Sequence, residues 1–213
     1  CIVGICPERK RFLKKLGKKS STSEIQSFLQ KAGDLPRPAE ARGRLIFALD
    51  ATASREATWD LASHLQAEMF NEVARSGSLD IQVCFYRGFG EFEAFPWYSG
   101  SQDILRKMTS VSCLGGKTQI EKILCHAREE TSRQKVNALV FIGDCMEEDP
   151  DKLCHLAGEL GLLSTPVFIF QEGNEMVAEK TFRQIARVSG GSYEKFDQSS
   201  AHRLSELLRA VVH

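Results

Sequence analysis

Short apolar segments alternate with helix-like segments through most of this 213-residue sequence. The apolar runs RLIFALD (44–50), NALVFIGD (137–144) and TPVFIFQ (165–171) have the length of strands. Strands that are covered on both faces have this continuous apolar pattern. Four segments between or after them have apolar residues at helical spacing, at 55–75, 118–133, 150–161 and 175–190. This alternation predicts an α/β fold with a mostly parallel sheet that helices cover on both faces.

One pair of strands breaks the parallel pattern. The segments LDIQVCFYR (79–87) and EFEAFPW (91–97) flank the tripeptide GFG and predict a β-hairpin. A hairpin makes one strand antiparallel, and residues 91–95 are the natural edge strand. A short helix at 101–111, a strand at 191–196 and a helix at 200–212 complete the predicted elements. We therefore expect a three-layer, doubly wound, Rossmann-like sheet with one antiparallel edge strand.

The first 43 residues differ in character from the rest. Residues 8–19 contain seven basic residues and one acid, residues 21–33 resemble a short capped helix, and the two prolines of 34–43 predict an extended linker. The sequence thus predicts a basic N-terminal extension over 1–43 and a main domain over 44–213. The basic arm suits an acidic partner, nucleic acid, anionic lipid, or a solvated helix packed on the domain. No wider basic face accompanies it, so nucleic-acid binding is not indicated.

Composition narrows the class of protein further. The chain has 42% apolar and 26% charged residues, as ordinary globular domains do. No apolar run approaches the roughly 20 residues that cross a bilayer. The seven cysteines form no CxxC pair, and several fall inside predicted strands or helices. Buried free thiols in a reducing compartment fit this usage, which predicts a cytoplasmic location.

Two of the apolar strands end in aspartate, at Asp50 and Asp144. Parallel strands bring their carboxyl ends to one rim of the sheet, where ligands of such folds bind. Two unpaired carboxylates there repel and raise each other's pKa, which a cation between them prevents. Thr52 and Ser54 follow Asp50 at alternate positions, and Thr118 follows a glycine pair. These side chains predict a metal site.

Carboxylates and hydroxyls form a hard oxygen set, which suits Mg²⁺, with Mn²⁺ or Ca²⁺ as alternatives, and disfavours Zn²⁺. Gly115 and Gly116 allow the backbone to approach closely in the loop before Thr118. Cys145 follows Asp144 directly, and we expect it to be buried behind the metal loop.

These residues resemble a known pattern. The order D-x-T-x-S at 50–54, GG-x-T at 115–118 and Asp144 at the end of a later strand resembles a von Willebrand factor A-type (VWA) domain. The resemblance covers residues 44–213 and implies a six-stranded sheet with a metal-ion-dependent adhesion site. Carried over by position, Thr52, Ser54 and Thr118 would be direct hydroxyl ligands, with Asp50 and Asp144 acting largely through water. The chain has Thr52 where the family usually has serine, which keeps the oxygen and adds a methyl group.

The resemblance implies a non-catalytic module whose metal binds a partner's Asp or Glu carboxylate, and similar intracellular proteins often serve multi-protein assemblies. If the sheet is wound as predicted, the hairpin tip and the loop 147–149 lie at the same rim. We therefore expect partner contacts from the hairpin and the loops around the metal, namely from Arg87, Phe89, Gly115, Gly116 and Glu147.

Three other interpretations remain at this stage. Each hydroxyl or aspartate, taken singly, could cap a helix. The sequence also resembles haloacid-dehalogenase-like phosphatases, with Asp50 as nucleophile and FIGDCMEED as a later acidic motif. That mechanism needs an acid two residues after the nucleophile, where this chain has Thr52. The third interpretation is a scaffold domain whose metal site is vestigial.

Overall fold

The computed structural model of the chain describes residues 42–75, 79–99, 101–108 and 110–211. The predicted helix at 21–33 and nearly all of the predicted linker lie outside these residues. The first strand begins at Gly43, one residue before the predicted start of the main domain. The division of the chain into an extension over 1–43 and a domain over 44–213 stays a prediction.

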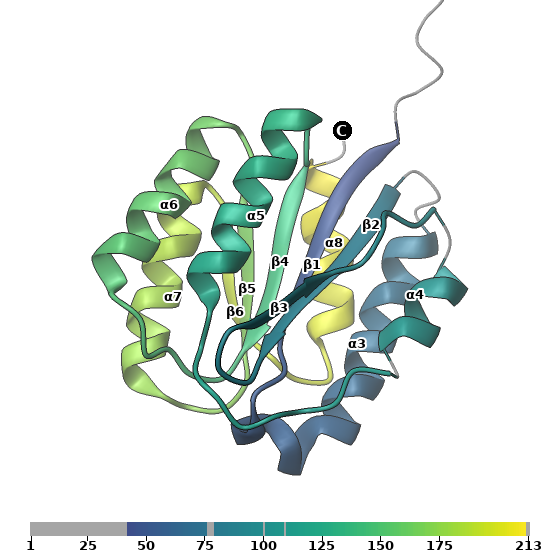
Figure 1. Cartoon of the computed structure of the whole chain (residues 1–213). Coiled ribbons are helices and arrows are strands. Elements are labelled where there is room, and N and C mark those ends of the chain that lie inside the picture. Colours follow the sequence, from purple (N-terminus) through teal and green to yellow (C-terminus); the bar gives the residue numbers. More distant parts are fainter. Residues whose placement is uncertain (1–41, 76–78, 100, 109, 212–213) are drawn as a thin grey trace, which may run out of the picture. The chain divides into compact units, whose positions relative to one another are not determined.

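The described residues form one sheet with the strand order β3-β2-β1-β4-β5-β6 (Figure 1). Its strands are β1 (Gly43–Asp50), β2 (Leu79–Arg87), β3 (Glu91–Ala94), β4 (Ala138–Gly143), β5 (Val167–Gln171) and β6 (Tyr193–Lys195). Neighbouring strands are parallel except β2 and β3, which pair antiparallel as a hairpin. The predicted mostly parallel sheet with one antiparallel edge strand is confirmed.

Helices cover both faces of the sheet and make the fold three layers deep (Figure 1). The described helical segments are η1 (Ala53–Thr58), α3 (Trp59–Arg75), α4 (Ser101–Met108), α5 (Ile120–Arg133), α6 (Pro150–Leu162), α7 (Met176–Ser189) and α8 (Ser200–Val211). Helices α3, α4 and α8 pack on one face, and α5, α6 and α7 on the other. The predicted doubly wound arrangement is therefore confirmed.

Strand β1 lies at the centre of this sandwich. Leu45, Phe47 and Leu49 face the layer of α3, α4 and α8. Ile46 and Ala48 face the layer of α5, α6 and α7. Successive side chains of a strand point to opposite faces, so a strand covered on both sides must be apolar throughout. This position explains the unbroken apolar run, which delivers Asp50 to the rim of the sheet.

Both edges of the sheet are short strands. Strand β3 spans four residues, with Glu91 and Glu93 exposed, and the chain then passes through Pro96. Proline has no amide hydrogen to donate to a ladder, which limits the edge on that side. On the other side, β6 spans only the three residues Tyr193–Lys195. Neither edge therefore presents a long unpaired ladder.

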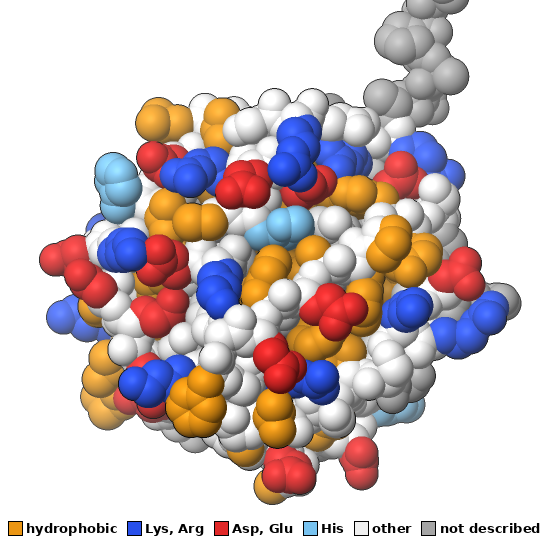
Figure 2. Space-filling view, viewed as in Figure 1, with side chains coloured by type: hydrophobic (Ala, Val, Ile, Leu, Met, Phe, Trp, Pro, Cys, Tyr) orange, Lys and Arg blue, Asp and Glu red, His pale blue; other side chains and the backbone are white. Residues whose placement is uncertain are grey.

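Basic and acidic side chains of the described residues are interspersed over the face shown in Figure 2, so neither sign of charge dominates it. No described helix has both the length and the apolar character that crossing a bilayer requires.

Candidate metal centre

Asp50 is the last residue of β1, and its side chain is fully buried. The backbone N–H of Thr52 donates to Asp50 Oδ1 at 2.8 Å, and the hydroxyl of Tyr86 donates to Asp50 Oδ2 at 2.8 Å. Tyr86 is the residue opposite Asp50 on the adjacent strand β2. These two bonds fix the orientation of the carboxylate while each oxygen keeps a further lone pair for another partner.

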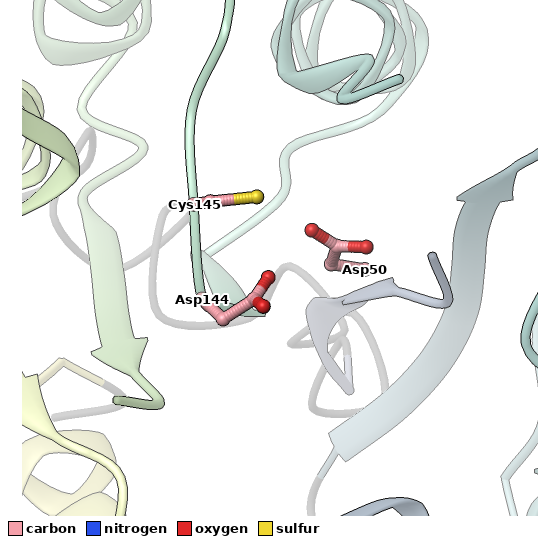
Figure 3. A group of neighbouring side chains, drawn as sticks. All are labelled: Asp50, Asp144 and Cys145. Carbon is pink, nitrogen blue, oxygen red and sulfur yellow. The ribbon is translucent and has the colours of Figure 1, made fainter. Parts of the chain in front are cut away.

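Asp144 follows strand β4, the other neighbour of β1. One carboxylate oxygen of Asp50, one of Asp144 and the sulfur of Cys145 all lie within 4.8 Å of one another (Figure 3). Asp144 Oδ1 is buried and accepts no hydrogen bond from the described residues. An unpartnered carboxylate oxygen is costly when water cannot reach it, so this atom calls for a ligand.

Thr118 joins the loop before α5 to the loop after β4. Its hydroxyl accepts a hydrogen bond from the backbone N–H of Glu147 at 3.0 Å, and its own N–H donates to Glu147 Oε2 at 3.3 Å. The side chain is nearly buried, with 6% of its surface exposed. This reciprocal pair holds the Thr118 hydroxyl at the rim where β4 ends.

A cavity of about 140 Å³ opens between these loops. Its lining comes from three separated segments of the chain: Thr52, Ala53, Ser54, Gly116, Thr118, Cys145 and Glu147. Within it, Thr52 Oγ1 lies 3.0 Å from Ser54 Oγ. The structure therefore brings the three predicted hydroxyls to one cavity, next to the carboxylates of Asp50 and Asp144. That these five residues bind a metal stays a prediction.

The helix-capping interpretation does not describe these side chains. Helix α5 begins at Ile120, two residues later than predicted, and the carboxylate of Glu148 accepts from its first N–H groups at 2.7 and 2.8 Å. Asp149, rather than Asp144, caps α6. Thr52 occupies the N-cap position of η1 without forming a side-chain cap. None of these caps comes from a predicted metal-binding side chain.

The residues predicted to contact a partner lie around the same loops. Gly88, at the hairpin tip, accepts from Lys117 N–H through its carbonyl and donates to the Leu114 carbonyl. Phe89 is 84% exposed and Glu147 is exposed. Arg87 pairs with Glu91 and donates to Ser112, so it also braces the loop. Gly115 is exposed, whereas Gly116 packs against the Gly88 backbone. Contact with a partner stays a prediction.

Arg55 is a site residue that the sequence analysis missed. Its side chain is 1% exposed, its Nε pairs with Glu172 Oε2 at 2.7 Å, and its Nη1 donates to the carbonyl oxygen of Asp50 at 2.5 Å. Arg55 thereby anchors the turn that carries Asp50 to the segment after β5. The pair spans 117 residues, and no local pattern in the sequence signals it.

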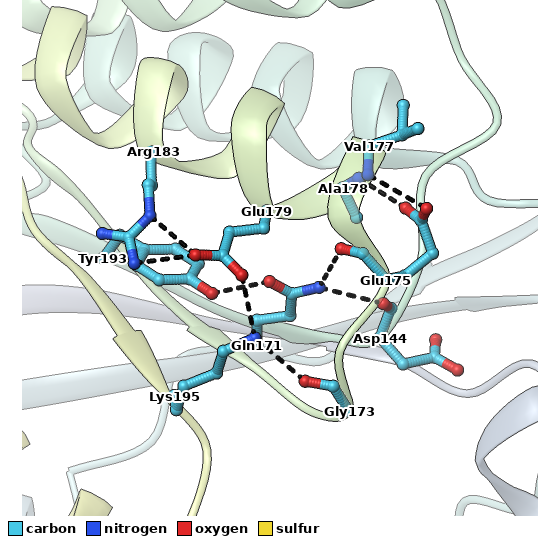
Figure 4. Close-up of polar contacts among 10 residues, drawn as sticks. All are labelled: Asp144, Gln171, Gly173, Glu175, Val177, Ala178, Glu179, Arg183, Tyr193 and Lys195. Atoms are coloured by element: carbon cyan, nitrogen blue, oxygen red, sulfur yellow. Dashed lines mark hydrogen bonds and ion pairs between the residues drawn. The ribbon is translucent and has the colours of Figure 1, made fainter.

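A second support acts on Asp144 from the end of β5. The side-chain amide of Gln171 lies between the carbonyl oxygens of Asp144 and Glu175, at 3.4 and 2.9 Å (Figure 4). The hydroxyl of Tyr193 donates to the Gln171 oxygen at 2.6 Å. The buried amide therefore fixes the backbone at Asp144 to the start of α7 and to β6.

The electrostatics of the cavity follow from burial. Burial raises the pKa of Asp50 to about 6, and the nearby Asp144 raises it as well, although the hydrogen bonds from Thr52 and Tyr86 lower it. Burial, together with the Asp144 and Asp50 charges, raises the pKa of Cys145 to about 12. A buried carboxylate that resists ionisation gains most from a cation beside it. Cys145 was expected behind the metal loop, but its side chain lines the cavity instead.

This pKa predicts a specific pH dependence in the presence of a chelator. The native state holds the Asp50 proton more tightly than the unfolded chain, so the stability gained from that proton is complete below about pH 4 and lost as the pH rises through 6. Asp50→Asn removes the titrating carboxyl and with it this loss of stability at rising pH. Urea unfolding at several pH values should show that the free energy of unfolding of the variant, relative to that of the wild type, rises by up to about 3 kcal/mol between pH 4 and 7.

The exposed Asp60 supplies the control, because Asp60→Asn should follow the wild-type profile. Other carboxylates, such as Glu179 and Asp197, have lowered pKa values and give the opposite slope, so the difference between variants is the quantity to measure. A parallel profile for Asp50→Asn and the wild type would contradict the burial argument.

Three observations indicate that these donor atoms suit a divalent cation. Two carboxylate oxygens lie within 4.8 Å of each other, a carboxylate oxygen of Asp144 is buried without a hydrogen bond, and three residues with hydroxyls line the adjoining cavity. Carboxylate and hydroxyl oxygens are the ligands that Mg²⁺, Mn²⁺ and Ca²⁺ prefer.

Comparison with known proteins identifies the fold. No family model and no curated protein matches the sequence. Among solved structures, the VWA domain of SpRpn10 superposes with a TM-score of 0.61 at 11% identity, over 79% of this chain and 94% of that one. Manganese-loaded TRAP protein from Plasmodium vivax gives a TM-score of 0.63 at 15% identity, over 78% and 72%. This chain has the fold of a VWA domain.

A von Willebrand factor type A structure from Catenulispora acidiphila also matches, with a TM-score of 0.60 at 15% identity. The match covers 78% of this chain and 42% of that longer one. The resemblance stated from the sequence is thereby confirmed for the fold. At such low identities the likeness does not extend to the site, so the prediction of metal binding rests on the residues described above.

Proposed function

We propose that this VWA domain is a non-catalytic protein-interaction module that binds a divalent cation and, through it, a carboxylate of a partner protein. Mg²⁺ is the first candidate, with Mn²⁺ or Ca²⁺ as alternatives. The proposed metal-binding residues are Asp50, Thr52, Ser54, Thr118 and Asp144. The convergence of three hydroxyls from two separate loops on one cavity beside two carboxylates carries this proposal.

The residues have distinct parts in this proposal. Thr52, Ser54 and Thr118 offer neutral oxygens from the cavity walls, while Asp50 and Asp144 supply negative charge from behind. The hydroxyls add no negative charge of their own, so only the two carboxylates compensate the charge of the ion. A divalent ion held this way supplies an electrophilic coordination position for a partner's Asp or Glu carboxylate. Tyr86 and Thr52 orient Asp50, and Arg55 holds the turn in place.

The surroundings of the cavity suggest how a partner is chosen. Phe89 offers an apolar contact at the hairpin tip, and Glu147 offers an acidic one at the cavity itself. Arg87 and Gly116 shape the loop between them, and Gly115 leaves its surface open. A partner carboxylate for the proposed metal, with an apolar neighbour for Phe89, is the feature that suits this site.

Nothing in the cavity favours the phosphatase alternative. Position 52 has a threonine whose hydroxyl lies next to Ser54, and the described residues that line the cavity include no lysine to hold a phosphate. We also infer a reducing, cytoplasmic setting, since five cysteines of the described residues are free thiols. Membership of a multi-protein assembly stays part of the proposal.

The test is metal binding by Thr118→Val, which removes one hydroxyl and keeps the volume of the side chain. Saturating Mg²⁺ should stabilise the wild type by about 2.7 kcal/mol at a hundred times the dissociation constant. The variant should lose most of this gain, as measured by titration calorimetry and by thermal unfolding with Mg²⁺ or EDTA. An array of Asp- and Glu-containing peptides should bind the wild type only when Mg²⁺ is present.

Thr58→Val is the matched control, because Thr58 is exposed in η1 and its hydroxyl donates only to the Arg55 carbonyl. It should bind Mg²⁺ as the wild type does. A wild-type protein that Mg²⁺, Mn²⁺ and Ca²⁺ all leave unchanged would instead establish the vestigial scaffold.

A further inference from the structure

The cavity contains a sulfur donor, Cys145, that the proposed Mg²⁺ site does not use. Cys145 lines it together with the three hydroxyls, and its sulfur points toward the space between the carboxylates of Asp50 and Asp144 (Figure 3). The buried Asp144 Oδ1 lies beside it and has no hydrogen-bond partner among the described residues. Sulfur and two carboxylates thus converge on one point.

We infer that the site has a second mode, in which Cys145, Asp50 and Asp144 bind a thiophilic divalent ion such as Zn²⁺ in competition with Mg²⁺. This inference rests on the proposed metal site and adds to it a choice between ions. Mg²⁺ is a hard ion that gains nothing from sulfur, whereas Zn²⁺ binds thiolate, carboxylate and imidazole ligands. The thiol proton leaves to solvent when the sulfur binds the ion.

The geometry is close to what such an ion needs. Tetrahedral ligands at roughly 2.0–2.3 Å from a zinc ion lie roughly 3.3–3.5 Å from one another. The three donor atoms already lie within 4.8 Å of one another, so small movements of the Asp144 and Cys145 side chains toward the fixed Asp50 carboxylate would close the set. Three protein ligands and one open position is also the arrangement of zinc sites that bind a further group.

The two modes differ in charge. In the Mg²⁺ mode the hydroxyls of Thr52, Ser54 and Thr118 add no charge, so the ion faces only the two negative charges of the carboxylates and the site is neutral as a whole. A thiolate and two carboxylates carry three negative charges, more than a divalent ion can neutralise. An external carboxylate would then approach a site of net negative charge. Zn²⁺ should therefore displace Mg²⁺ and suppress the capture of acidic peptides.

Co²⁺ provides an optical probe of the thiophilic mode, because a cobalt–thiolate bond gives a charge-transfer absorption in the ultraviolet. Full-length wild-type protein under reducing conditions should develop this band with one equivalent of Co²⁺, and Zn²⁺ should bleach it. In Cys145→Ser the band should disappear and the Zn²⁺ affinity should fall roughly tenfold or more. Mg²⁺ stabilisation of that variant should match the wild type.

Two further variants separate the modes. Cys154→Ser is the matched control, because Cys154 is also half-buried but lies on α6 and does not line the cavity. It should keep the Co²⁺ band. Thr118→Val should lose the Mg²⁺ response and keep the band.

The outcomes distinguish this inference from the proposed function. An unchanged band and Zn²⁺ affinity in Cys145→Ser would overturn the second mode, and so would a wild type that binds Mg²⁺ but gives no band. A protein that gives the Cys145-dependent band but no response to Mg²⁺ would keep the thiol ligand and overturn the proposed Mg²⁺ site.

Discussion

The Gly116→Ala variant is expected to lose about 2–3 kcal/mol of stability and most of its affinity for Mg²⁺. A Cβ atom at this position would lie 1.9 Å from the carbonyl oxygen of Gly88 and 2.2 Å from its carbonyl carbon. Both are backbone atoms, so no side-chain rotation relieves the clash. Either the hairpin tip or the loop must move, and Thr118 lies only two residues further on.

The movement would also break the contacts between the loop and the hairpin. Lys117 donates to the Gly88 carbonyl at 3.2 Å, and Gly88 donates to the Leu114 carbonyl at 3.4 Å. These bonds place the loop on the tip and, with it, the Thr118 hydroxyl in the cavity. Urea unfolding measures the loss of stability, and titration calorimetry measures the loss of Mg²⁺ binding.

The adjacent glycine is a stringent control. A Cβ atom at Gly115 would meet nothing within 4 Å, so Gly115→Ala should change the free energy of unfolding by less than about 0.5 kcal/mol. Its Mg²⁺ affinity should equal that of the wild type. Equal behaviour of the two alanine variants would show that the loop does not pack on the hairpin as described.

The Arg55→Met variant is expected to be destabilised by about 3–5 kcal/mol. Methionine keeps much of the buried volume but removes the guanidinium that pairs with Glu172 and donates to the Asp50 carbonyl. The Glu172 side chain, which is 17% exposed, is left without its counter-charge. For a domain of this size the midpoint of thermal unfolding should fall by roughly 10 °C.

Arg87→Met tests whether burial is the cause. Arg87 pairs with Glu91 at the same 2.7 Å distance, but these side chains are 28% and 54% exposed. Exposed ion pairs contribute about 1 kcal/mol or less, so this variant should lose far less stability. Similar losses in the two variants would sink the claim that Arg55 is a structural anchor of the site. Arg55→Met should also weaken Mg²⁺ binding, because the Asp50 turn is no longer held to the segment after β5.

The parts of the fold that the sequence predicted are those with a local signal. The apolar run of β1 reflects burial on both faces, and Asp50 and Asp144 mark the ends of neighbouring strands. The start of α5 was placed two residues too early, because its cap is the side chain of Glu148 from another loop. Periodicity within a helix cannot report a cap that comes from elsewhere in the chain.

The parts of the site that the sequence did not predict depend on distant contacts or on side-chain direction. From the sequence alone, Arg55 is an ordinary charged residue at the start of a helix. Its burial against Glu172 is visible only in the structure. Gly116 was expected to allow a close backbone approach, but only the structure shows that the approaching backbone is that of Gly88. Cys145 was recognised as a neighbour of Asp144, but the direction of its sulfur follows from the path of the chain after β4.

The shortness of the two outer strands has a consequence for how this molecule can associate. With β3 limited to four residues that carry Glu91 and Glu93, and β6 limited to three, another chain finds little backbone to pair with at either side. Such borders discourage amyloid-like stacking and domain swapping through the sheet. Association of the described domain through its sheet edges should therefore be weak, and a partner should bind it through loops and side chains.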